Sequence, residues 1–174
     1  MRKDRIKRIT FTALMTAISV VLSFVEGLLP TAYFMPPGSK LGLSNIPIMF
    51  CASSLTFGET MLIVVAKSIF VFITRGFTAF CMSLIGGILS AICMFLMLRK
   101  SKGFGYAGVG IASATCHNLG QLSVSFFLVQ SSAIIGYAPV MLIASVITGF
   151  LTGTLLRLSM PYFSKLIFVK EMEK

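Results

Sequence analysis

Acidic residues are scarce in this sequence of 174 residues. Only five residues are Asp or Glu, against fifteen Lys or Arg, and Asp4 is the single aspartate. Enzymes that act on diphosphates hold Mg²⁺ with clustered carboxylates, and no two acids lie together in an apolar stretch here. The G-x-x-x-x-G-K-[ST] loop that binds ATP phosphates is also missing. We therefore expect no enzymatic activity, and no ATP hydrolysis by this chain itself.

Possible metal ligands are few as well. The four cysteines are scattered through apolar sequence without C-x-x-C spacing, and His117 is the single histidine. A free cysteine in apolar surroundings behaves as a small hydrophobic residue, so we expect reduced cysteines in the core. The sequence predicts no metal site and no cofactor.

Charged residues of both signs make up only 11% of the chain, whereas 56% are hydrophobic and the mean hydropathy is +0.95. A soluble domain has about 25% charged residues, so this composition indicates an integral membrane protein. We expect an all-α fold: one membrane domain over residues 1–174, formed by a polytopic bundle of transmembrane helices. A net charge of +10 suggests nucleic acid in a soluble protein, but here the cations flank apolar stretches and no nucleic acid is expected.

Hydrophobic runs and their boundaries predict six spans. They cover about residues 9–29, 41–57, 60–74, 78–98, 106–129 and 139–158. Five cations precede the first span, three follow the fourth, and four lie at or beyond the end of the sixth. Six spans place all of these on one side of the membrane, as the positive-inside rule requires. Both termini are therefore expected in the cytoplasm, with the protein in the cell membrane.

The second span begins with an unusual stretch. Asn45 is a good helix N-cap, and Pro47 fits the first helical turn. A helix from Ile46 to about Phe57 is roughly 18 Å long, too short to cross a membrane alone. The preceding segment must then lie at membrane depth, where irregular backbone needs protein or water around it. A helix start beside Lys40 suits an anionic group; the alternative is a loop whose Lys40 reaches the lipid headgroups.

Ionisable residues at membrane depth are functional candidates because burying an unpaired charge there is costly. Lys67 and Arg75 lie about 80° apart around the third helix, so both can border one cavity. Glu26 is the only acid near the outer half, and a Glu26–Lys67 ion pair is possible. With Lys40, the three cations outnumber this acid, which favours an anionic solute.

His117, Asn118 and Gln121 form a polar stripe on the fifth helix, because residues three and four apart share a helix face. The stripe bonds either a neighbouring helix or a solute. Together with three residues from elsewhere in the chain it gives the candidate substrate-binding set: Lys40, Asn45, Arg75, His117, Asn118 and Gln121.

Ala13 and Ala17 are a small-xxx-small pair in the first helix, which lets another helix approach closely. That helix belongs either to a partner subunit or to the bundle itself.

Three stretches carry a resemblance to a known family. They are Gly38–Pro47 (GSKLGLSNIP), Ser83–Ser90 (SLIGGILS) and His117–Gln121 (HNLGQ). The chain from about Ile9 to Leu158 resembles the Gx transporter family, often labelled heptaprenyl diphosphate synthase component I. It is also similar to the S components of energy-coupling factor (ECF) transporters.

The resemblance to S components implies six helices, cytoplasmic termini and a solute site near the outer face. It also implies that an alanine pair in the first helix docks the membrane T subunit, and Ala13 and Ala17 match that pair. Energy for transport would come from separate ATPase subunits, in keeping with the missing phosphate-binding loop.

The preferred hypothesis is a substrate-binding, S-component-like subunit for uptake of a small anionic vitamin or cofactor precursor, with T and ATPase subunits as partners. One alternative is a non-catalytic membrane component I of heptaprenyl diphosphate synthase in menaquinone biosynthesis. Another is a membrane partner in flavin- or quinone-linked electron transfer. The missing carboxylates conflict with a synthase activity, so transport is preferred here.

Overall fold

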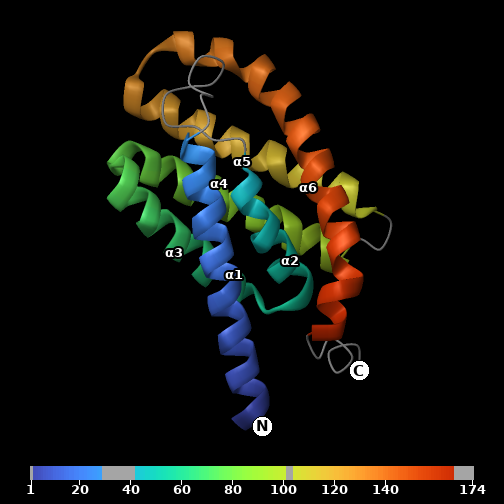
Figure 1. Cartoon of the computed structure of the whole chain (residues 1–174). Helices are drawn as coiled ribbons and strands as arrows, with labels where there is room; N and C mark the ends of the chain where they lie inside the picture. The colour runs from blue at the N-terminus through green and yellow to red at the C-terminus, as the bar shows by residue number, and fades with distance from the viewer. Residues whose placement is uncertain (1, 29–41, 101–103, 167–174) are drawn as a thin grey trace.

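The computed structural model describes residues 2–28, 42–100 and 104–166. Almost all of these residues are helical, without a β-strand among them, which confirms the expected all-α class. Six α-helices and two short 3₁₀ helices lie within the described ranges (Figure 1). They are α1 (Arg2–Leu28), η2 (Leu43–Asn45), α2 (Ile46–Ser54), α3 (Phe57–Arg75), α4 (Phe77–Lys100), α5 (Tyr106–Val129), η3 (Ser132–Tyr137) and α6 (Ala138–Leu166).

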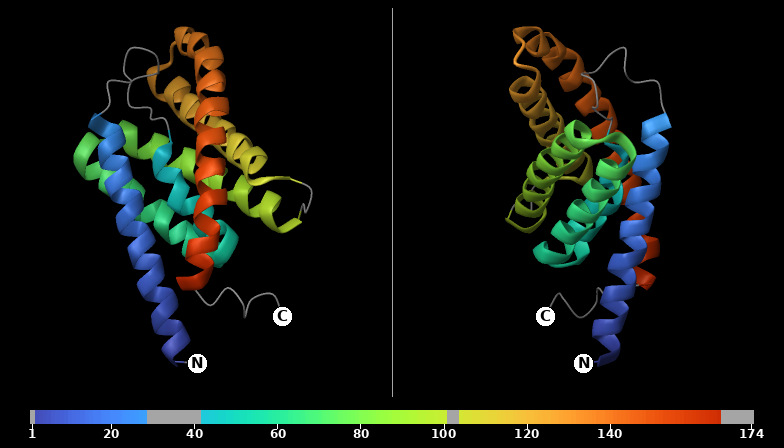
Figure 2. Two further views of the ribbon diagram at one scale, coloured as in Figure 1. Left: turned by 45° about the vertical axis from the view of Figure 1, so that its right-hand side comes forward. Right: turned by 90° about the vertical axis from the view of Figure 1, so that its left-hand side faces the viewer.

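α1 and α6 run lengthwise through the molecule, and α1 lies along its outside (Figures 1 and 2). The first residues of α1 and the last described turn of α6 lie at the same end in all three views. This arrangement agrees with two termini on one side of a membrane. Which side that is stays a prediction.

Four helical stretches of the described residues are long and apolar enough to cross a membrane. They are Arg5–Leu28, Phe57–Arg75, Phe77–Arg99 and Ser132–Tyr162. α2 has only nine residues, in agreement with the prediction that it is too short to cross a membrane alone. α5 has 24 residues but is not among the four stretches. Membrane crossing by α2 and α5 therefore stays a prediction.

The helix ends differ from the expected spans at both ends of the chain. α1 begins at Arg2 rather than near residue 9, and α6 continues through Pro161 to Leu166 rather than ending near residue 158. Proline removes one backbone donor and bends a helix, but it need not end one. The segment after Pro161 is helical as far as Leu166.

α2 lies at the centre of the bundle. Ile48, Met49, Cys51 and Ala52 have no exposed surface, and α2 contacts α1, α3, α4 and α6. A helix that is apolar on all sides belongs in such a position. The short helix is therefore a core element held between longer ones.

Glycines allow the closest helix crossings. Between α4 and α5, a Cβ on Gly86 would lie 2.8 Å from the carbonyl oxygen of His117, so the small-residue stretch Ser83–Ser90 of α4 faces a neighbouring helix. Between α5 and α6, a Cβ on Gly149 would lie 2.4 Å from the Cα of Ile111. Gly149 and Gly153 form a G-x-x-x-G pair, which the sequence analysis missed.

We predict that Gly149→Ala destabilises the protein by roughly 1–3 kcal/mol, the usual cost of overpacking, because the new methyl group meets backbone atoms. The measurement is the thermal unfolding midpoint in detergent. Gly136→Ala is the matched control, since nothing lies within 4 Å of a Cβ at that position. Equal midpoints for the two variants would show that the α5–α6 crossing is not tight.

Candidate functional site: a buried polar cluster around η2

The carboxylate of Glu26 caps the start of η2. Its Oε1 accepts hydrogen bonds from the backbone N–H groups of Gly42 and Leu43, both at 2.5 Å, and its Oε2 accepts one from the N–H of Ser44 at 3.3 Å. Glu26 is only 3% exposed. Gly42 adopts φ +95°, a left-handed conformation that favours glycine. An acid on α1 therefore supplies the acceptor that the irregular segment needs.

Lys67 binds the same segment from α3. Its Nζ donates to Asn45 Oδ1 at 2.8 Å and to Ser44 Oγ at 3.4 Å, and the residue is 1% exposed. Glu26 and Lys67 thus both bind residues 42–45, Glu26 through backbone groups and Lys67 through side chains. The structure brings the two predicted partners into one cluster, and the ion pair itself stays a prediction.

Asn45 directly precedes α2, and Pro47 lies in the first turn, as predicted. The side chain of Asn45, however, makes no capping hydrogen bond to α2. The backbone continues from η2 into α2, and the Asn45 side chain accepts from Lys67 instead. A capping acceptor was expected from Asn45 at the start of α2. The acceptor comes instead from Glu26, which caps the start of η2.

α5 contributes His117 and Gln121 to the cluster. Both are buried, and their Nε2 atoms are 2.8 Å apart. A Cβ on Gly42 would lie 3.7 Å from His117 Cδ2 and 3.2 Å from Asn45 Nδ2, so the histidine ring lies close to η2. Groups from α1, η2, α3 and α5 therefore meet at one place; we call Glu26, Ser44, Asn45, Lys67, His117 and Gln121 the buried polar cluster.

Asn118 lies on a different side of α5. Its Nδ2 donates to the carbonyl oxygen of Met141 at 3.1 Å and to Ser145 Oγ at 2.8 Å, both on α6. Its buried Oδ1 has no hydrogen-bond partner among the described residues. The predicted stripe is thus divided, with Asn118 bonding a neighbouring helix.

The other two candidate residues are not placed in this cluster. Arg75 is exposed at the end of α3, where its Cδ would lie 3.9 Å from a Cβ on Gly27. Lys40 lies outside the described residues. Sequence reasoning missed Ser19, whose hydroxyl donates to the carbonyl oxygen of Ser44 at 2.8 Å, because a serine in an apolar run gives no distinctive signal.

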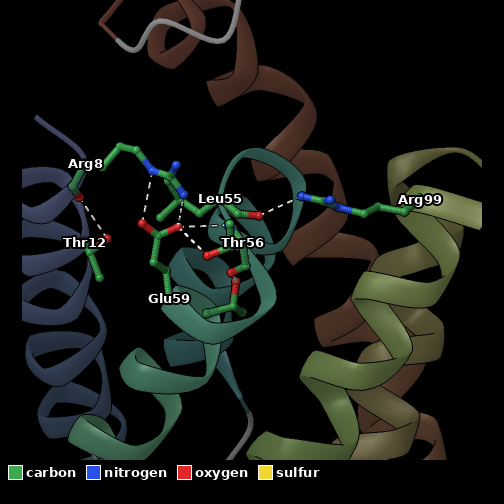
Figure 3. Close-up of polar contacts among 7 residues, drawn as sticks. Arg8, Thr12, Leu55, Thr56, Glu59 and Arg99 are labelled. Carbon is green, nitrogen blue, oxygen red and sulfur yellow. Dashed lines mark hydrogen bonds and ion pairs between the residues drawn. The ribbon is translucent and has the colours of Figure 1, made fainter. Parts of the chain in front are cut away.

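A second polar group clamps the turn between α2 and α3 (Figure 3). Arg8 binds Glu59 through both carboxylate oxygens, at 3.1 and 2.7 Å, and Glu59 also accepts from the N–H and hydroxyl of Thr56. Arg99 donates to the carbonyl oxygen of Leu55 at 2.9 Å. The basic start of α1 and the basic end of α4 therefore meet at the same turn. This agrees with the prediction that both lie on one side of the membrane.

Ala13 and Ala17 are both exposed on α1. The face of α1 that contacts the bundle carries Ser19 and Glu26 instead. The small pair is therefore free of packing within the described bundle, and it remains available to another helix.

Cys51 is buried and the other three cysteines are partly exposed; all four are free thiols. Within the described ranges, no group of three or more His, Cys, Asp or Glu residues could hold a metal ion.

The fold and these contacts define an all-helical bundle with buried charges and with helices of membrane-spanning length. The chain belongs to the heptaprenyl diphosphate synthase component I family, whose sequence model matches residues 15–158. The family is a non-catalytic membrane component, so both the suspected family and the expectation that the chain is not an enzyme are confirmed. Comparison with curated proteins and with solved structures found no match in either.

We predict that Lys67→Met lowers the free energy of unfolding by about 1.5–3 kcal/mol, the contribution of a hydrogen bond to a charged group. The reason is that Asn45 Oδ1 loses its buried donor. Arg75→Met is the control on the same helix, because Arg75 is exposed. Denaturant or thermal unfolding in detergent measures the difference, and equal stability of both variants would contradict the assigned role of Lys67.

Proposed function

We propose that this protein is the non-catalytic membrane component of a heptaprenyl diphosphate synthase that serves menaquinone biosynthesis. The family match over residues 15–158 carries the proposal. The positions of the acids support it. Glu26 is bound to backbone N–H groups, and Glu59 is bound to Arg8 near the other end of α1, so the two carboxylates do not form the clustered pair that diphosphate chemistry uses.

In this proposal the catalytic subunit is a separate protein, and this chain holds it at the membrane. A heptaprenyl chain is strongly apolar, so its transfer from water into lipid is favourable. A synthase held at the bilayer delivers its product directly to the phase where it dissolves. The exposed pair Ala13 and Ala17 on α1 is the proposed docking face for a helix of a partner membrane subunit.

We predict that replacing both Ala13 and Ala17 by Trp abolishes co-purification of a partner membrane subunit, because bulky side chains separate helices that small residues let approach. Mass spectrometry of the tagged complex identifies the partner. Val146→Trp on α6 is the control, since that side chain is also exposed, at 52%. A complex that survives the double substitution would place docking elsewhere.

The buried polar cluster favours a second candidate, a solute-binding subunit of the S-component kind. Buried ionisable side chains at membrane depth mark functional sites, and Lys67 and Glu26 are 1% and 3% exposed. In this candidate, Lys40, Asn45, Arg75, His117, Asn118 and Gln121 bind a small anionic vitamin or cofactor precursor. T and ATPase subunits would then supply the energy. Electron transfer with a flavin or quinone partner finds no supporting observation in the described part of the chain.

For this candidate, we predict that Gln121→Leu weakens solute binding about twofold to tenfold, as expected when a neutral hydrogen bond of about 0.5–1.5 kcal/mol is lost. Native mass spectrometry first identifies the retained solute, and calorimetric titration then compares the variants. Ser123→Ala is the control, because Ser123 is exposed and bonds only the Leu119 carbonyl of its own helix. Absence of any retained solute, or unchanged affinity, would argue for the synthase role alone.

A further inference from the structure

Three sulfur atoms meet where α4 packs against α5. The thiol of Cys93 donates to the thioether Sδ of Met97, one turn later on α4, and the two sulfur atoms are 3.7 Å apart. The thiol of Cys116, on α5, shares a hydrogen bond with the thiol of Cys93. We call Cys93, Met97 and Cys116 the sulfur triad.

The close crossing of α4 and α5 positions the triad. A Cβ on Gly120 would lie 2.8 Å from the Cα of Gly86, so the two backbones touch there. Cys93 lies about two turns after Gly86 on α4, and Cys116 lies about one turn before Gly120 on α5. The contact between the two thiols therefore follows from a backbone contact that is itself tight. Donor groups held in place in this way lose little freedom when they bind a ligand.

The spacing of the sulfur atoms fits two ligands of one metal ion. A metal–sulfur bond is about 2.3 Å long, and two sulfur atoms at that distance in tetrahedral or trigonal geometry are about 3.8–4.0 Å apart. The distance of 3.7 Å between Cys93 Sγ and Met97 Sδ is close to this value. The side chains therefore need only small movements to bind one ion together.

The donor types select the ion. Thiolate and thioether sulfur are soft ligands and suit Cu(I), whereas zinc takes Cys, His or carboxylate ligands, usually four of them. In the ranges that the structure describes, no third His, Cys, Asp or Glu joins the two cysteines. The third donor is the thioether of Met97, which favours Cu(I) over zinc.

Charge favours the same ion. The triad contains no charged side chain, and a charge in apolar surroundings is costly unless it is balanced. Cu(I) bound to one thiolate is neutral, with the other thiol and the thioether as uncharged ligands, and this binding releases one thiol proton to water. A divalent ion requires two thiolates for the same balance.

A buried hydroxyl lies on the same face of α4 as the triad. Ser90 precedes Cys93 by three residues and Met97 by seven, a spacing that places all three on one helix face. Ser90 has no exposed surface, and its Oγ has no hydrogen-bond partner among the described residues. A hydroxyl donor next to a metal-bound thiolate is typical of the groups that surround the ligands in metal sites.

An ion can reach the triad from outside the bundle. Cys93, Met97 and Cys116 are all partly exposed. Met97 lies only two residues before Arg99, which donates to the Leu55 carbonyl at the α2–α3 turn, so the triad lies near the basic end of α4. Binding therefore does not require the core around α2 to open.

We propose that the sulfur triad is a Cu(I) site, with Cys93 and Cys116 binding through their thiol groups and Met97 through its thioether. The site goes beyond the proposed role in a synthase and does not depend on it. The sequence predicted no metal site, because the cysteine spacing does not reveal a contact between two helices.

Titration with Cu(I) tests the site, in purified protein in detergent, without oxygen and against a chromogenic Cu(I) chelator. One Cu(I) ion should bind per chain. Loss of a group that only supports a metal ligand weakens binding about 10–100-fold, so Cys93→Ser and Cys116→Ser should each weaken it at least about a hundredfold. Met97→Leu nearly keeps the side-chain volume and should weaken binding about tenfold. Cys81→Ser, also partly exposed on α4, is the matched control and should leave the affinity unchanged.

X-ray absorption at the copper edge gives a second measurement, which requires no variant and so decides the question even if a cysteine variant does not fold. The spectrum should show sulfur ligands alone, at about 2.3 Å. Nitrogen or oxygen ligands at the copper would overturn the assignment. Equal Cu(I) affinity in the unchanged protein and in both cysteine variants would overturn it as well, as would tighter binding of Zn²⁺ than of Cu(I).

Discussion

Three backbone N–H groups at the start of η2 point to one buried carboxylate, and the centre of the bundle depends on this contact. Irregular backbone at membrane depth must find its hydrogen bonds within the protein. Glu26 satisfies that requirement for residues 42–44, which allows the nine-residue α2 to begin in the middle of the bundle. Lys67, on α3, donates hydrogen bonds to the same segment through the side chains of Asn45 and Ser44. A buried charge without a partner is costly in free energy. Glu26 and Lys67 avoid that cost because both bind residues 42–45, the segment that they stabilise.

Contacts elsewhere in the bundle hold the helices that carry these groups in place. The Arg8–Glu59 pair holds the N-terminal part of α1 to the α2–α3 turn, and Arg99 holds α4 to the same turn (Figure 3). Glycine crossings bring α4 and α6 close to α5, which fixes the position of His117 and Asn118. α1 is left with an outer face that the described bundle does not cover (Figure 2). A membrane component that works only with other subunits needs such a face.

Much of the fold could be predicted because local rules decide it. Hydrophobic runs located the helices, Pro47 marked the start of α2, and the length of α2 showed that it could not cross alone. The glycine seam of α4 was visible as a cluster of small residues. Pro161 shows the limit of such rules, because the surrounding helix continues through it.

The candidate site was harder to predict, because its contacts join residues far apart in the sequence. Glu26 meets backbone groups that begin sixteen residues later, and backbone donors leave no mark in the sequence. The polar stripe on α5 predicted buried groups correctly, but a stripe does not show that Asn118 turns toward α6 while His117 turns toward η2. Asn45 was expected to cap α2, and its side chain binds Lys67 because η2 already continues into that helix.

We propose that this chain is the membrane component of a two-part synthase and leaves the chemistry to its partner. The most direct test is heptaprenyl diphosphate formation by the catalytic subunit in liposomes with and without this protein. We expect no product from this chain alone, and substantially more product from the two proteins together than from the catalytic subunit by itself. An equal rate of heptaprenyl diphosphate formation with and without this chain would contradict it.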